Sequence, residues 1–164
     1  MSLMDAPAYN ARRENLKRNL LIGTGVTLLL IAVIALAGII TGHGWFFSNL
    51  GAEHKIDKFL TAVEKKDFTT AYGIYVNDQD WQQHPYKYSN YPLQRFTEDW
   101  TTYSPAGEVI KSHHVDKSIV DGSGPFGTGV IVAVTVNGSK RIFIWYERKD
   151  GTLTYPTPHI FEYK

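Results

Sequence analysis

The chain of 164 residues contains no cysteine. Disulfide bonds, thiolate catalysis and cysteine-based zinc or iron–sulfur sites are therefore excluded. A folded domain of this chain must be stabilised by the packing of its core. Its four Trp, ten Tyr and eight Phe suit that requirement.

The chain also lacks an excess of positive or negative charge. The formal net charge is +1, and residues 51–164 hold 13 Lys and Arg against 14 Asp and Glu. Binding to nucleic acid depends on a basic face that neutralises phosphates. We therefore expect no nucleic-acid partner.

Charges are missing altogether from the 21 residues between Leu20 and Ile40, most of which are apolar. As a helix this run would reach about 30 Å, the thickness of the hydrocarbon core of a bilayer. We expect a transmembrane helix over residues 19–41, which residues 11–18 can extend. The lipid bilayer is thus the first expected partner.

The basic residues near this run lie on one side of it, because the next Lys after Lys17 is Lys55. The positive-inside rule then predicts a cytoplasmic tail (1–18), a hinge-like juxtamembrane linker (42–51) and an extracytoplasmic domain (52–164), as in a protein of the bacterial inner membrane. The residues expected at the membrane interfaces are Arg12, Arg13, Lys17 and Arg18 on the inner side and Trp45, Phe46 and Phe47 on the outer side.

A cleavable signal peptide is the alternative interpretation, since Ala35-Leu36-Ala37 has the small-x-small form of a cleavage site. The anchor is favoured because the apolar run continues past this site and an aromatic belt follows it. Gly38 and Gly42 form a GxxxG pair that permits close approach of a second helix, although glycine is common in membrane helices in any case.

From Ala52 onwards the pattern predicts an α+β domain. Three helices are followed by four antiparallel strands, so the helices should cover one face of a curved sheet. Asn137-Gly138 is typical of a type I′ turn between two strands. The predicted helices are 52–64, 67–75 and 92–103, the predicted loops are 77–91 and 121–125, and the predicted strands are 109–120, 130–136, 140–148 and one from 152.

Two segments carry a resemblance to a known superfamily. They are FLTAVEKKDFTTAYGIY (Phe59–Tyr75) and RFTEDWTTYSPAGEVI (Arg95–Ile110). The order of elements and these helices resemble the nuclear transport factor 2-like superfamily, which includes ketosteroid isomerases and SnoaL-like cyclases. The resemblance implies a cone-like fold with an internal pocket and an outer sheet face that is used for dimerisation. A single span followed by such a domain is also similar in layout to scaffold subunits of type IV secretion systems, an architectural analogy alone.

The resemblance implies that a pocket, if present, lies inside the cone. The candidates for its lining are Tyr72, Phe96, Asp99, Trp100 and Tyr103. In the isomerase branch an Asp base works with hydrogen-bond donors inside the cone. No residue of this chain can be assigned such a role, and an ordinary surface carboxylate explains Asp99 better. We therefore predict no catalytic residue and no cofactor.

Two surfaces are predicted to contact a partner, because both are apolar or aromatic beyond the needs of one core. The candidates in the loop are Trp81, Tyr86, Tyr88 and Tyr91, and those in the sheet are Ile142, Ile144 and Tyr146. Alternatively, the loop closes the open end of the cone as a lid, and strand curling buries the second sheet face.

His113, His114 and Asp116 are the one cluster of metal-ligand types in the sequence. Adjacent residues of a strand point to opposite faces, so the two His cannot hold one ion without a bulge. A polar strand edge explains these residues better, and we predict no metal site.

The favoured hypothesis is a non-enzymatic, single-pass accessory or assembly subunit. Its domain would dock onto other subunits of a membrane complex or onto a second copy of itself. The alternative is a small-molecule-binding or isomerase/cyclase-like domain that uses the cone, which requires an enclosed pocket with a desolvated carboxylate or His.

Overall fold

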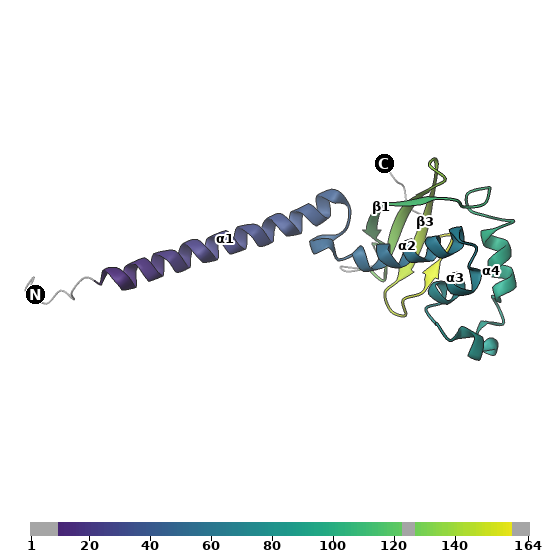
Figure 1. Cartoon of the computed structure of the whole chain (residues 1–164). Coiled ribbons are helices and arrows are strands. Elements are labelled where there is room, and N and C mark those ends of the chain that lie inside the picture. Colours follow the sequence, from purple (N-terminus) through teal and green to yellow (C-terminus); the bar gives the residue numbers. More distant parts are fainter. Residues whose placement is uncertain (1–9, 123–126, 159–164) are drawn as a thin grey trace, which may run out of the picture.

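The computed structural model describes residues 10–122 and 127–158. It has a long N-terminal helix, α1 (Ala11–Thr41), followed by an α+β domain (Figure 1). Asn10 caps α1 by accepting the Arg13 amide at 3.1 Å. The helix ends at Gly42, which adopts a left-handed conformation with φ 83°.

Helix α1 is long and apolar enough to cross a membrane, a property that it shares with signal sequences. Its 31 residues extend about 46 Å. Among them only Ala35 and Gly38 are buried, and the remaining apolar side chains project away from the protein. The predicted span over 19–41 lies within this helix, and the predicted extension from Ala11 is confirmed.

The segment predicted as a hinge is instead a compact turn. After Gly42 the chain folds back as a short 3₁₀ helix, η2 (Trp45–Phe47), which packs on the end of α1 (Figure 1). A Cβ atom on Gly38 would lie 2.3 Å from the Gly44 carbonyl oxygen and 2.7 Å from the Phe47 nitrogen. The turn therefore needs glycine at position 38, and it occupies the GxxxG surface that a second helix would use.

Three helices of the domain follow in the predicted order, with differences at their ends. They are α2 (Leu50–Glu64), α3 (Phe68–Tyr75) and α4 (Leu93–Trp100). Asp67 caps α3 as predicted, accepting the Thr70 amide at 3.1 Å. Helix α4 ends at Trp100 rather than Tyr103. The predicted loop 77–91 contains two short 3₁₀ helices, η3 (Trp81–Gln83) and η4 (Pro85–Tyr88).

The four strands form an antiparallel meander in the order β1-β2-β3-β4. Asn137 and Gly138 have φ of 50° and 73°, which confirms the turn of positive φ between β2 and β3. Strand β1 begins at His113 and not at Val109, and the predicted loop 121–125 lies partly outside the described residues. The strands are β1 (His113–Val120), β2 (Gly129–Val136), β3 (Lys140–Glu147) and β4 (Leu153–Thr154).

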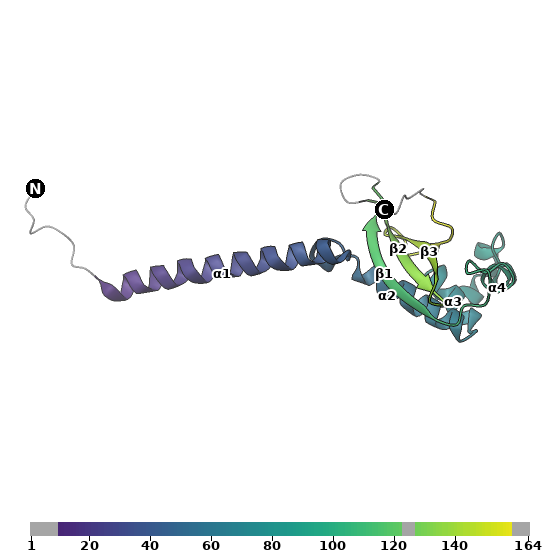
Figure 2. The same cartoon turned by 90° about the horizontal axis from the view of Figure 1, so that it is seen from above.

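Helices and sheet share one hydrophobic core. The apolar stripe of α2 faces one side of the sheet, and the two views show α2 and α3 lying against that side (Figure 1, Figure 2). The stripe consists of Ile56, Phe59, Leu60 and Val63, and the sheet contributes Val130, Val132, Val134, Val136, Ile142 and Ile144. This packing confirms an α+β fold with helices on one face of the sheet.

Two of the predicted partner contacts are wrong in this fold. Ile142 and Ile144 are 3% and 0% exposed, because they lie on the face of the sheet that packs against the helices in the common core. The opposite face is also covered within the chain, since Ile131, Ala133 and Trp145 are buried as well. The sheet thus leaves little apolar area for a second copy.

We predict that Phe59→Ala destabilises the domain by about 3–5 kcal/mol, because a buried aromatic ring is replaced by a cavity. The Phe59 ring is fully buried and its centroid lies 4.8 Å from that of Trp100 and 5.6 Å from that of Tyr75. Urea unfolding of the full chain in detergent, followed by Trp fluorescence, measures the effect. Val109→Ala, at an exposed position, is the matched control and should change stability by less than about 0.5 kcal/mol. Equal destabilisation by the two variants would contradict the placement of Phe59 in the core.

Candidate functional site

The junction between α1 and the domain is held by a polar network. The Gly42 carbonyl accepts the Ser118 amide of β1 at 2.8 Å. The Glu53 carboxylate of α2, which is 7% exposed, accepts the Ser118 hydroxyl at 2.5 Å and contacts His43 Nδ1 at 2.9 Å. One buried carboxylate thus connects the turn after α1, the first domain helix and the edge strand.

A second contact at this junction is made by Asn49, the residue before α2. Asn49, which is 1% exposed, accepts a hydrogen bond from Arg148 Nη2 at 3.3 Å through its Oδ1 atom. The main-chain N–H of Asn49 also donates to the His43 carbonyl at 3.1 Å. Together these bonds close the turn between α1 and α2 and tie it to Arg148, which follows β3. No local pattern in the sequence predicts this network, because its members are spread over more than 100 positions without a motif.

The residues predicted for the outer membrane interface lie at this junction. Trp45 and Phe46 are exposed on η2, and Phe47 is half-buried with its ring against His43. Exposed aromatic side chains next to an exposed apolar helix are typical of a membrane interface. The predicted inner group, Arg12, Arg13, Lys17 and Arg18, is exposed on the first turns of α1.

Residues 77–91, here called the aromatic loop, divide into a packed part and an exposed part. Trp81, Tyr88 and Tyr91 pack against the core, and the Tyr72 ring lies 4.8 Å from that of Trp81 and 6.0 Å from that of Tyr88. Tyr72 also donates its hydroxyl to the Tyr91 carbonyl. Tyr86, in contrast, is 93% exposed. The loop therefore covers one end of the core as a lid and presents Tyr86 to the outside.

Asp78 holds the aromatic loop in place. Its Oδ2 atom accepts the Tyr88 hydroxyl at 2.6 Å and contacts His84 Nδ1 at 3.2 Å and Lys87 Nζ at 3.4 Å. The hydrogen bond from Tyr88 is the largest cause that holds the pKa of Asp78 below its usual value of 3.8. In the sequence Asp78 is one of two carboxylates in the loop, with Asp80, and no pattern distinguishes it as the residue that anchors the loop.

The predicted pocket residues fall into two groups. Tyr72 and Phe96 are fully buried in the core, where Phe96 packs against Phe59 and Tyr75. Asp99, Trp100 and Tyr103 line an open hollow of about 220 Å³ together with Tyr91, Tyr155 and Pro156. The core thus occupies the space where the resemblance implied a pocket.

The Asp99 carboxylate is committed to structural contacts. It accepts the Tyr91 hydroxyl at 3.0 Å and pairs with Arg95 Nε at 3.2 Å. Burial raises the pKa of the Tyr91 hydroxyl, which therefore stays protonated and donates. The described residues thus hold the Asp99 carboxylate in one hydrogen bond and one ion pair.

The predicted histidine cluster is separated by the structure. His113 lies between two carboxylates of α2, with Nδ1 2.5 Å from Glu64 Oε1 and Nε2 3.1 Å from Asp57 Oδ1. His114 is exposed, and Asp116 sits at a bulge in β1 and accepts the Thr135 hydroxyl at 2.7 Å. The two carboxylates face opposite ring nitrogens, and in the part of the chain that the structure describes no group of three such residues could hold a metal ion.

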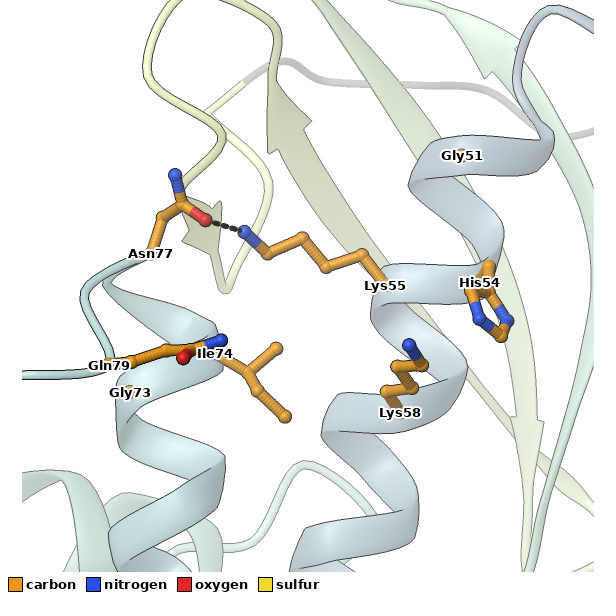
Figure 3. Close-up of a pocket in the computed structure, with 8 residues that line it drawn as sticks. All are labelled: Gly51, His54, Lys55, Lys58, Gly73, Ile74, Asn77 and Gln79. Atoms are coloured by element: carbon orange, nitrogen blue, oxygen red, sulfur yellow. Dashed lines mark hydrogen bonds between the residues drawn. The ribbon is translucent and has the colours of Figure 1, made fainter.

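A polar groove lies between α2 and α3, and no pattern in the sequence predicts it. One end of it is a hollow of about 400 Å³ lined by residues of both helices and by Asn77 and Gln79 (Figure 3). Lys55 reaches from α2 across this end and donates to Asn77 Oδ1 at 2.5 Å and to the Gly151 carbonyl at 2.6 Å. Burial is the main reason that the pKa of Lys55 is lowered. In the sequence, Lys55 and Lys58 look like part of an ordinary solvated helix face.

Comparison with known proteins adds no relative: no protein-family model, no curated protein and no solved structure matches the chain.

We predict that Glu53→Ala weakens the junction, because the removal of the carboxylate leaves the His43 ring and the Ser118 hydroxyl without their partner. The expected loss is about 1–3 kcal/mol in unfolding free energy. Hydrogen exchange of the Ser118 amide should also accelerate, since its bond to Gly42 lies in the same network. Glu108→Ala, which removes an exposed carboxylate 3.8 Å from Lys111, should change stability by less than about 0.5 kcal/mol. Similar losses in both variants would contradict the role given to Glu53.

We also predict that the aromatic loop loosens in acid. Because the pKa of Asp78 is lowered in the folded state, its stabilisation is present above pH 3.8 and is lost as the pH falls through the lower folded value. The ring resonances of Tyr88 should report this titration. Asp78→Asn should abolish it, whereas Asp80→Asn should leave it intact; a titration that survives Asp78→Asn would show that another group anchors the loop.

Proposed function

We propose that the chain is a single-pass membrane accessory or assembly subunit. Helix α1 anchors it, with the N-terminus in the cytoplasm of a bacterium and the domain outside the inner membrane. The domain docks onto other subunits of a larger complex through the exposed part of the aromatic loop around Tyr86. The kinship with nuclear transport factor 2-like domains belongs to this proposal, supported by the order of the elements and the helices over the sheet.

The junction is the observation that carries the proposal. The would-be cleavage site at residues 35–37 lies inside α1, and the next residue, Gly38, is packed against the turn of residues 44–47. The end of α1 is also bonded to β1 through Gly42 and Ser118. Cleavage would remove the helix on which this turn is built, so these contacts favour a permanent anchor over a removable leader.

Docking is favoured over chemistry by the contents of the domain. The core is filled by Phe59, Phe96 and Trp100, and the Asp99 carboxylate is paired with Arg95. The small-molecule alternative would have to use open surface hollows such as the one beside Tyr103, not an enclosed pocket inside the core. A large aromatic side chain that is held out of the core at a loop tip is typical of a residue that anchors an interface.

We expect a photo-crosslinking amino acid at position 86 to give discrete adducts in native membranes. The same substitution at Tyr103, an exposed tyrosine beside the Asp99 hollow, is the matched control and should give few. An adduct of twice the chain's mass identifies a second copy, and other discrete masses identify other subunits. Recovery of unlinked chain alone would contradict docking. A shortened chain that leaves the membrane without detergent would contradict the anchor.

A further inference from the structure

The groove between α2 and α3 continues beyond the part shown in Figure 3. A second hollow of about 400 Å³ shares Lys58, Gly73, Ile74 and Gln79 with the first and extends it to Trp81 and Gln82. Because four residues line both hollows, they form one elongated groove. It runs from the start of α2 to the beginning of the aromatic loop.

The charge of this groove is of one sign. Its lining includes two lysines, Lys55 and Lys58, and contains no Asp or Glu, although residues 51–164 hold slightly more acidic than basic residues. Lys55 donates to two neutral oxygens, so its charge is not neutralised by direct contact. The carboxylate that acts on Lys55 most strongly is Asp150, whose Oδ1 atom is engaged by Thr152.

Neighbouring carboxylates are occupied elsewhere. Asp57 and Glu64 of α2 face His113, and Asp78, which lies between Asn77 and Gln79 in the chain, binds Tyr88. Lys58 is exposed and makes no ion pair with another residue that the structure describes. The groove therefore presents cationic and amide donors that the described part of the chain does not neutralise.

The arrangement of the donors indicates the shape of the ligand. Lys58 lies on the α2 wall, Lys55 crosses one end of the groove to Asn77, and Gln79 and Gln82 come from the segment after α3. The donors are thus spread along the groove instead of converging on one point. Ile74 and Trp81 add apolar surface between them. Donors that are spread along an open groove suit an extended chain, whereas a small anion needs donors that converge on it.

We infer that this groove binds an extended acidic segment of the partner protein, with carboxylates at Lys55 and Lys58 and an apolar side chain at Ile74 and Trp81. The inference rests on the proposed docking function and names the partner's chemistry. Since the groove ends at the aromatic loop, one segment can occupy the groove while the partner's surface contacts Tyr86.

The test uses the full chain in non-ionic detergent and a fluorescein-labelled decaglutamate peptide, with binding followed by anisotropy. Binding should weaken steeply with salt, because several ion pairs are screened together. Lys58→Glu should weaken it at least about tenfold by placing a carboxylate in the groove. Lys65→Glu makes the same charge change on an exposed residue outside the groove and should alter binding less than about twofold. Gln79→Trp should block the groove without any change of charge.

Three results would overturn the inference. They are no binding of the peptide, equal losses of peptide affinity in Lys58→Glu and Lys65→Glu, or displacement of the peptide by inorganic phosphate that carries the same total charge as the peptide. Equal losses would indicate a diffuse effect of net charge, and displacement by phosphate would indicate a small-anion site.

Crosslinking from position 86 separates this inference from the docking proposal. The adducts should decrease in Lys58→Glu and Gln79→Trp membranes but not in Lys65→Glu membranes. Adducts that persist unchanged in all three variants overturn the inference and leave docking intact. An absence of adducts in the otherwise unchanged chain contradicts docking, while the anisotropy measurement still decides what the groove binds.

Discussion

The burial of the apolar stripe of α2 against the sheet is the constraint on which the other features depend. Ile56, Phe59, Leu60 and Val63 can be removed from water together only if α2 lies against the sheet, over β1 and β2, in one rotational setting. That setting directs Glu53 to the junction and Asp57 and Glu64 to His113. It also leaves Lys55 and Lys58 facing α3. The polar sites of the domain are thus by-products of how its core is packed.

The connection of about eight residues between α1 and α2 is held in one conformation by the contacts of the junction. Glycine at position 38 lets the turn approach the helix, and the Gly42 carbonyl then meets the edge strand at Ser118. This solution uses the small-residue surface of α1 within one chain. The buried Glu53 makes the joint specific, because a carboxylate removed from water must find donors, and His43 and Ser118 provide them.

Local patterns predicted much of this fold because each of them has a local cause. The period of α2, the Asp67 cap and the Asn137-Gly138 turn depend on residues close together in the chain, and all three are present. The end of the third helix was overestimated, since Tyr103 has the spacing of an inward residue but lies past the last turn. Strand alternation identified the two faces of β3, yet it could not tell which face the helices would cover, and this is why Ile142 and Ile144 were misassigned.

The candidate sites could not be predicted to the same extent, because they arise where distant segments meet. The groove needs α2 beside α3, the Lys55 contacts bring in Gly151, and the junction combines residues 42–53 with Ser118 and Arg148. Of the predicted sites, the exposed Tyr86 and the hollow at Asp99 survive as surfaces. The histidine cluster does not survive, because His113 contacts two carboxylates of α2 that are distant from it in the sequence.

For the proposed membrane-anchored subunit, the folded-back turn after α1 also has a consequence for encounter rates. A domain on a flexible tether samples all orientations, and most collisions with a partner in the same membrane present the wrong face. A domain whose first helix and edge strand are bonded to its anchor keeps the tilt of that anchor, so its freedom reduces largely to rotation about one axis and diffusion in two dimensions. Less orientational entropy is then lost at each productive collision, and a modest contact area can suffice for a stable complex.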